Sequence, residues 1–202
     1  MSAAFGRDAL LDAFDRIGRA AVKAGTKLQI AVYGGSALML ASNFRSATED
    51  VDVSKLEHPL PGWLAEQVRE LAVEKKWRDD WFNDGVVFHL SSLADSANDH
   101  LEFGTFPRDG SPVGLAVSVP TAEYLLALKL KAFRVMDPVR GENERLDILN
   151  LMRVVGISTV DDAVALLGRY FPLSAASAEK QRFLLKKNMS KEGAADAPKY
   201  PR

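Results

Sequence analysis

The sequence predicts an α/β (α+β) fold in which helices flank a mixed β-sheet and a helical C-terminal part follows. Two observations carry this prediction. Short apolar and β-branched segments, bounded by glycines or by alternating polar residues, lie before residue 120 and are typical of strands. From Pro120 onward, apolar residues recur at helical spacing, and the stretch from Thr159 starts with capping residues.

The first 119 residues are expected to form a core with an N-terminal helix. Leu10, Phe14, Ile17 and Ala21 recur at helical spacing within residues 1–23 and predict an amphipathic surface helix. Further helices are expected at 36–41 and 61–76, and strands at 27–33, 51–53, 86–90, 101–106 and 115–119. The strand at 86–90 is expected because Asn83-Asp84-Gly85 is a strong hairpin-turn signal directly before a β-branched run.

The remaining residues are expected to form a helical part, 120–188, packed on the core. Its predicted helices are 121–135, 144–155, 159–170 and 177–187. The last segment, 189–202, is small, polar and proline-bearing, so it offers too little apolar surface to pack. We expect this tail to be disordered.

Composition narrows the classes of function. The 202 residues, 47% of them hydrophobic, suffice for one sizeable core or for one domain with a small helical appendage. With 26 Lys and Arg against 27 Asp and Glu, any nucleic-acid contact would have to be local. The absence of cysteine excludes disulfides, thiolate metal sites and cysteine nucleophiles, whereas a hard cation bound by oxygen ligands remains open. No signal peptide or membrane span is evident, so we expect a cytoplasmic protein without a membrane partner.

The segment Gly34-Gly35-Ser36 is a candidate phosphate-binding turn. Two glycines after a strand allow a sharp turn and let a ligand approach the main chain. Ser36 adds a hydroxyl at the start of the next expected helix, where free amides and the helix dipole favour phosphate. The alternative is a tight turn that uses glycine for purely conformational reasons.

Asp50 and Asp52 are candidate metal ligands. Val51 and Val53 alternate with them, so both carboxylates are expected on one face of a strand, where they repel unless a cation or a proton lies between them. Mg²⁺ is commonly held by one or two carboxylates and completes its octahedron with waters and phosphate oxygens, which would connect this pair to the glycine turn. The alternative is a solvated strand end.

The run GGSALML, followed by Arg45, Thr48, Asp50 and Asp52, resembles the active-site signature of the DNA polymerase β-like nucleotidyltransferase superfamily over residues 27–53. The resemblance implies a nucleotidyltransferase-like mixed sheet, nucleotide binding by the Gly-Ser turn with Arg45 and Thr48, and Mg²⁺ or Mn²⁺ on the Asp pair. Polymerase-like members use a third carboxylate on a neighbouring strand, for which Glu102 is the candidate.

The segments LLALKLKAFR and RLDILNLMRVVGI resemble the C-terminal part of small bacterial nucleotidyltransferases related to abortive-infection toxins. The resemblance implies that Lys129 and Asp147 help to form the site, with Lys131 as the competing assignment. Helical spacing places Lys129 on the apolar stripe, where a lysine needs a partner, and Lys131 towards the flank. The alternatives are a snorkelling Lys129 and an Asp147 that only favours the first turn of its helix.

Together these resemblances imply an enzyme that transfers a nucleoside monophosphate from a nucleoside triphosphate to an acceptor RNA or protein. They also imply a toxin–antitoxin role, with a cognate antitoxin protein as partner. The alternative is a catalytically inactive module that binds nucleotide or a partner protein.

The tryptophans are expected in the core and the histidines as surface or hydrogen-bonded residues. A C-terminal basic cluster would either contact phosphates or form a solvated helix face. These residues are Trp63, Trp77, Trp81; His58, His89, His100; and Lys180, Arg182, Lys186, Lys187, Lys191.

Overall fold

The computed structural model describes residues 3–56, 59–133, 136–137, 140–189 and 198–201. The chain divides into two compact units. The first unit comprises Met1–Ala41, Arg45–Phe88 and His100–Val119, and the second comprises Ser42–Phe44, His89–Asp99 and Pro120–Arg202.

The part of the chain up to Pro120 contains the strands and three of the α-helices. The strands are β1 (Phe5–Gly6), β2 (Leu28–Val32), β3 (Ala47–Thr48), β4 (Val51–Ser54), β5 (Phe82–Asn83), β6 (His100–Phe106) and β7 (Leu115–Pro120). The helices are α1 (Arg7–Lys23), α2 (Gly34–Ala41), α3 (Gly62–Lys75) and the short 3₁₀ helix η1 (Gly85–His89). Most of these elements were predicted to within a few residues.

The main sheet has five strands in the order β5-β4-β2-β7-β6, and β1 pairs with β3 in a separate small sheet. Strand β2 pairs antiparallel with β4 and parallel with β7, and β4 pairs parallel with β5, so the main sheet is mixed. The predicted fold class, a mixed sheet with flanking helices and a helical C-terminal part, is confirmed.

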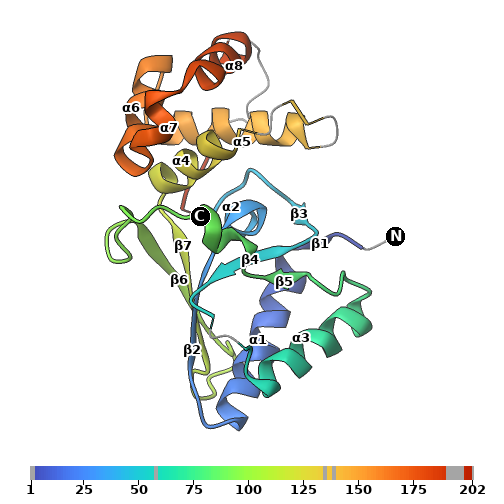
Figure 1. Ribbon diagram of the computed structural model, residues 1–202. Coiled ribbons are helices and arrows are strands. Elements are labelled where there is room, and N and C mark those ends of the chain that lie inside the picture. The colour runs from blue at the N-terminus through green and yellow to red at the C-terminus, as the bar shows by residue number, and fades with distance from the viewer. Residues whose placement is uncertain (1–2, 57–58, 134–135, 138–139, 190–197, 202) are drawn as a thin grey trace. The chain divides into compact units, whose positions relative to one another are not determined.

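Helices α1 and α3 lie side by side against the sheet (Figure 1). The predicted apolar stripe of α1 forms its buried face, and Leu10, Phe14 and Ile17 are fully buried. Trp77 and Trp81 are buried as expected, but Trp63 is only half-buried. The core-facing residues of α3 begin with Leu64, so Trp63 lies one position off the buried stripe.

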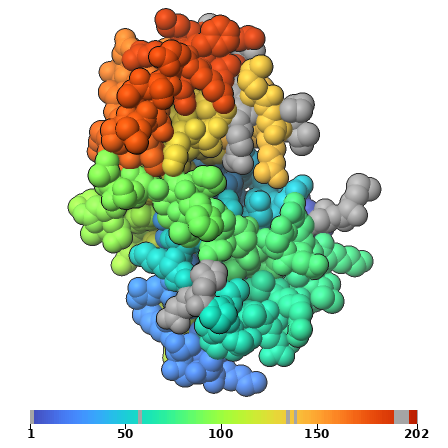
Figure 2. Space-filling view, in the orientation of Figure 1, coloured from blue at the N-terminus to red at the C-terminus, as the bar shows by residue number. Residues whose placement is uncertain are grey.

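The predicted strand at 86–90 is wrong. The side chain of Asn83 accepts a hydrogen bond from the amide of Gly85 at 3.0 Å, and the chain closes into η1 instead of turning back as a hairpin. The apolar run that predicted the strand is not buried, since Phe88 is 88% exposed. Figure 2 shows this green part of the chain open at the surface.

The second unit consists mainly of helices. They are α4 (Ala122–Ala132), α5 (Gly141–Val154), α6 (Val160–Tyr170), α7 (Pro172–Ala176) and α8 (Glu179–Met189). Helix α4 packs on α5 and α6, and the hydroxyls of Thr121 and Thr159 cap α4 and α6. Helix α4 ends before Phe133, which adopts the left-handed conformation; the predicted extension over 134 and 135 lies outside the described residues.

The segment His89–Asp99, which begins at the last residue of η1, belongs to the same unit and is tied to the helices by hydrogen bonds. The amide of Ser91 donates to the Tyr124 hydroxyl at 3.0 Å, and the Tyr170 hydroxyl donates to Asp99 at 2.6 Å. Of the predicted tail, residues 190–197 and 202 lie outside the described part, while the amide of Lys199 donates to the Asn43 side chain at 2.9 Å. Within the described residues, no helix combines the length and apolarity needed to cross a bilayer.

Candidate functional site

Gly34 brings the main chain against a carboxylate. It lies between β2 and the body of α2 with φ of 65°, a conformation that favours glycine. A Cβ atom at this position would stand 2.7 Å from Oδ2 of Asp52. The backbone of the preceding residue is also fixed here, because the amide of Tyr33 donates to the Asp52 carbonyl at 2.8 Å. Glycine is therefore required at residue 34 for both conformation and space.

Two hydroxyls hold the backbone of Asp50. The Ser36 hydroxyl donates to the Asp50 carbonyl. The Thr48 hydroxyl lies 3.1 Å from the same carbonyl and 3.4 Å from Oδ1 of Asp50. Gly35 faces this group, since a Cβ atom there would lie 3.4 Å from the Thr48 hydroxyl and 3.7 Å from Nη1 of Arg45.

The structure thus brings the predicted residues of the first unit into one cluster. We call this cluster the glycine–aspartate site; its members are Gly34, Gly35, Ser36, Arg45, Thr48, Asp50 and Asp52. The two carboxylates are half-buried, and the fully buried Val51 and Val53 anchor the strand between and after them. The alternation that predicted a strand here is therefore confirmed, although Asp50 itself precedes β4 by one residue.

The third carboxylate was assigned to the wrong strand. Glu102 is exposed on β6, which β2 and β7 separate from β4. The strands that flank β4 are β2 and β5, and the residue paired with Asp52 in β5 is Asn83. Among the described residues, no group of three or more His, Cys, Asp and Glu side chains is arranged to hold a metal ion. Strand order is a non-local property, and the local sequence pattern could not supply it.

The donors at this site are nevertheless of the class that a hard cation takes. Registered residues of paired strands lie on the same face, so Asn83 is on the face of Asp52, while its side-chain amide donates to the Asp80 carbonyl and accepts from the Gly85 amide. Mg²⁺ binds one or two carboxylates, and waters and substrate phosphates complete its shell. The residues present therefore fit a Mg²⁺ ion that is completed by a bound triphosphate.

A buried polar group lies directly behind the site and was not predicted. Tyr33 is 2% exposed, and its hydroxyl lies 2.8 Å from Nε2 of His100 and 3.3 Å from the donating Ser54 hydroxyl. Burial raises the pKa of Tyr33, and the hydrogen bond from Ser54 lowers it in part. His100 is thus hydrogen-bonded, as expected for a histidine that is not a metal ligand. Local sequence offers no signal for a contact between residues 33 and 100.

The second unit contains a buried ionic cluster formed by Lys129, Glu144 and Asp147. The Lys129 ammonium lies 2.9 Å from Asp147 and 3.2 Å from Glu144, and all three side chains are at most 6% exposed. The prediction that Lys129 has a partner is confirmed. Glu144 was missed, although it stands three residues before Asp147 and so lies on the same face of α5.

Lys131 has the surroundings predicted for a flanking lysine. Its ammonium donates to the His89 carbonyl at 2.9 Å and lies 4.3 Å from the centre of the Phe171 ring. It has no buried carboxylate partner within the described residues, so its surroundings differ from those of Lys129.

The other predicted features are peripheral to these clusters. His89 is exposed. Arg182 of the basic cluster on α8 pairs with Asp161 of α6. His58 and Lys191 lie outside the described residues.

Comparison with known proteins adds little to this geometry. No protein-family profile matches the chain, and no curated protein matches it in sequence. The crystal structure of an antigenic nucleotidyltransferase-like protein from Paracoccidioides brasiliensis is similar over 96% of this chain and 98% of that chain, with 12% identity and a TM-score of 0.39. A likeness this distant carries no argument about residues or chemistry.

Proposed function

We propose that the chain is a Mg²⁺- or Mn²⁺-dependent nucleotidyltransferase that transfers a nucleoside monophosphate from a nucleoside triphosphate to an acceptor hydroxyl. The observation that supports this most is the contact between Gly34 and Asp52. It sets the half-buried main chain at the start of a helix, suited to phosphate, against a carboxylate suited to the accompanying cation.

The glycine turn, the two hydroxyls and the two carboxylates of the glycine–aspartate site have different parts in this reaction. Asp50 and Asp52 would hold the cation, which neutralises the triphosphate and favours in-line attack. The amides at the start of α2 bind phosphate oxygens, while Thr48 and Ser36 keep the Asp50 backbone in place. The acceptor oxygen bonds to the α-phosphorus, the bond to the β-phosphate bridging oxygen breaks, pyrophosphate leaves, and a carboxylate of the pair takes the acceptor proton.

Further parts of the proposal rest on the sequence resemblance. Arg45 binds phosphate, and Lys129 and Asp147 act on phosphate charge and orientation. The acceptor is an RNA or a protein, the setting is a cytoplasmic toxin–antitoxin pair, and a cognate antitoxin protein neutralises the chain. Expression of the chain alone tests the toxin role, because a harmless chain contradicts it. Co-expression with the product of an adjacent small gene tests whether that product is the antitoxin.

Transfer is tested by incubating the protein with each labelled triphosphate, Mg²⁺ and a cell extract. We expect label in RNA or protein, and its loss in the double variant Asp50→Ala, Asp52→Ala. Asp79→Ala is the matched control, because Asp79 is an exposed carboxylate in the same unit. Equal labelling by the double variant would contradict the assignment of Asp50 and Asp52 to the transfer reaction.

A second candidate is a non-catalytic module that binds nucleotide and acts on a partner protein. It is favoured by the neutral Asn83, the residue of β5 paired with Asp52, where the chain supplies an amide and not a third carboxylate. Calorimetry separates the two candidates. Mg²⁺-dependent triphosphate binding without transfer to any acceptor supports the non-catalytic module. Transfer to an acceptor contradicts it.

A further inference from the structure

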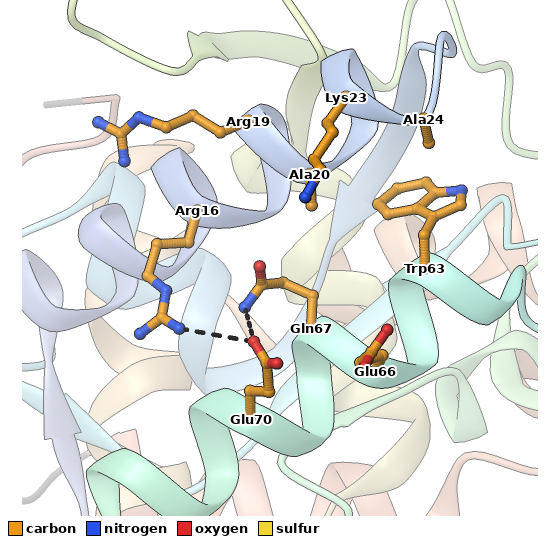
Figure 3. Close-up of a pocket in the computed structure, with 9 residues that line it drawn as sticks. All are labelled: Arg16, Arg19, Ala20, Lys23, Ala24, Trp63, Glu66, Gln67 and Glu70. Carbon is orange, nitrogen blue, oxygen red and sulfur yellow. Dashed lines mark hydrogen bonds and ion pairs between the residues drawn. The ribbon is translucent and has the colours of Figure 1, made fainter.

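Trp63 lies at the junction of two surface hollows of the first unit. One hollow, of about 670 Å³, runs between α1 and α3 and is lined by Arg16, Arg19, Ala20, Lys23, Ala24, Trp63, Glu66, Gln67 and Glu70 (Figure 3). The other, of about 350 Å³, is bounded by residues that include Lys27, Lys55 and Trp63. Trp77 and Trp81 are buried, so Trp63 is the one tryptophan of the chain with an accessible ring.

The charges around this ring are unevenly compensated. Arg16 contacts Glu70 and Glu74, and Arg19 contacts Asp109, so these two cations are already paired. Lys23, Lys27 and Lys55 are exposed, and none of them forms an ion pair with another described residue. Glu66 is the acidic side chain that lines the first hollow besides Glu70. The surroundings of Trp63 therefore carry excess positive charge.

An aromatic face among unpaired lysines matches the chemistry of a single-stranded nucleic acid. A base stacks on the ring, and neighbouring phosphates lie within reach of ammonium groups. An acidic peptide would satisfy the lysines but would leave the ring face without a flat partner. Among anionic polymers, single-stranded nucleic acid is the class that uses both features.

The two hollows are separate from the glycine–aspartate site. The smaller one includes Leu28 and Gln29 at the start of β2, whereas Gly34 follows the end of that strand. At about 3.3 Å per residue, the step from Leu28 to Gly34 spans roughly 20 Å, whereas Lys55, which also lines this hollow, follows Asp52 by three residues, or roughly 10 Å. Trp63 and the start of β2 therefore lie away from Gly34, and Lys55 is the member of this surface nearest to the triphosphate site.

We propose that Trp63, Lys23, Lys27 and Lys55 dock single-stranded RNA. This proposal rests on the proposed function, because it names RNA as the acceptor class of the transfer. It also makes the α1–α3 face of the first unit the surface by which an acceptor is recognised.

The test is fluorescence anisotropy with a fluorescein-labelled 12-nucleotide oligouridine in EDTA, without triphosphate. We expect Trp63→Ala to weaken binding about five- to 150-fold, as loss of one stacked base does, and Trp63→Phe to retain most of it. Oligouridine should also quench tryptophan fluorescence in the wild type and not in Trp63→Phe. Because Trp63 is half-buried, a second variant, Lys23→Glu with Lys55→Glu, probes the same surface at exposed positions.

The lysine variant should weaken binding and reduce the slope of log K against log salt by about 1.4 or more. Lys76→Glu with Arg153→Glu, at two exposed cations outside both hollows and outside the C-terminal basic cluster, is the charge-matched control and should leave binding unchanged. Unchanged binding in both the Trp63→Ala and lysine variants, or equally tight competition by a polyglutamate peptide, overturns the proposal. RNA binding should persist in Asp50→Ala with Asp52→Ala, because the assay contains neither a divalent cation nor a triphosphate. If the wild type binds RNA through Trp63 but transfers no label, the proposed function fails while RNA docking stands. If it transfers label but Trp63→Ala binds RNA normally, the docking proposal fails alone.

Discussion

Gly34 is the residue on which the glycine–aspartate site depends most directly. A side chain at this position would meet two obstacles, a left-handed φ of 65° and the Asp52 carboxylate 2.7 Å away. Gly25 has a φ of 68° but nothing within 4 Å of its would-be Cβ, so it faces the first obstacle alone.

Comparing these two glycines separates backbone strain from displacement of the carboxylate. We expect Gly25→Ala to cost about 1 kcal/mol of stability and to leave triphosphate binding unchanged. Gly34→Ala should cost more and should lower Mg²⁺-dependent triphosphate binding at least tenfold, because Asp52 must move. Urea denaturation and calorimetry measure the two effects. Equal behaviour of the two variants would show that the Gly34–Asp52 contact has no role in binding.

Asn83 gives a second prediction at this scale. Asn83→Asp puts a third carboxylate beside Asp52, where it repels the existing charge until a divalent cation is bound. The variant should melt at a lower temperature than the wild type in EDTA and should show the larger rise in melting temperature on adding Mg²⁺. Asn83→Ala controls for loss of the bond that the Asn83 amide donates to the Asp80 carbonyl, which Asn83→Asp also removes. If Mg²⁺ raises the melting temperatures of Asn83→Asp and the wild type equally, residue 83 is not part of a metal site.

At the scale of helices, α4 and α5 are joined by the pairs that Lys129 forms with Glu144 and Asp147. Both carboxylates would lose their counter-charge if Lys129 were truncated, and a buried charge without a partner is strongly destabilising. Helix α4 meets segment 89–99 in another way, through the exposed contact of Lys131 with the His89 carbonyl.

Lys129→Ala should therefore lower the free energy of unfolding by about 3–5 kcal/mol, and Lys131→Ala by less than about 1 kcal/mol. Arg at position 129 should rescue only in part, because a planar fork does not fit the place of a compact ammonium. Triphosphate binding should fall more in Lys129→Ala than in Lys131→Ala. The reverse order in binding would transfer the proposed role to Lys131.

The loop between β6 and β7 is attached to α1 by Asp109, which contacts Arg19 at 2.8 Å and accepts the Ser111 amide at 3.0 Å. The hydrogen bonds from Ser111 and Arg19 lower the pKa of Asp109 from 3.8 to about 2. A lowered pKa stabilises the fold above the unfolded value of 3.8, and this contribution is lost as the pH falls through about 2.

We expect the stability difference between wild type and Asp109→Asn to be constant above pH 5 and to shrink between about pH 4 and 2. Urea denaturation at several pH values measures it, and the comparison cancels the titration of other carboxylates. A difference that stays constant down to pH 2 would show that Asp109 is not held by these bonds in solution.

At the scale of the whole molecule, sequence periodicity predicted which segments form helices and strands, but not which of these elements lie next to one another. The stripe of α1, the buried β2 and the capped α6 follow from local patterns, and so do Gly34 and the Asp50–Asp52 alternation. The partners across the sheet do not. Glu102 was the candidate for a third carboxylate because strand order was unknown, and the contact of Tyr33 with His100 joins segments that no local pattern relates.

The parallel pairing of β2 with β7 has a consequence for the order in which the chain folds. Residue 28 pairs with residue 115, whereas the antiparallel partner of β2, β4, follows it closely. Contacts this distant in sequence form slowly, because a long loop must close before they stabilise anything. During synthesis at about 5–20 residues per second, Gly34, Asp50 and Asp52 emerge on the order of ten seconds before β7. Nascent chains that stop short of β7 should bind no triphosphate.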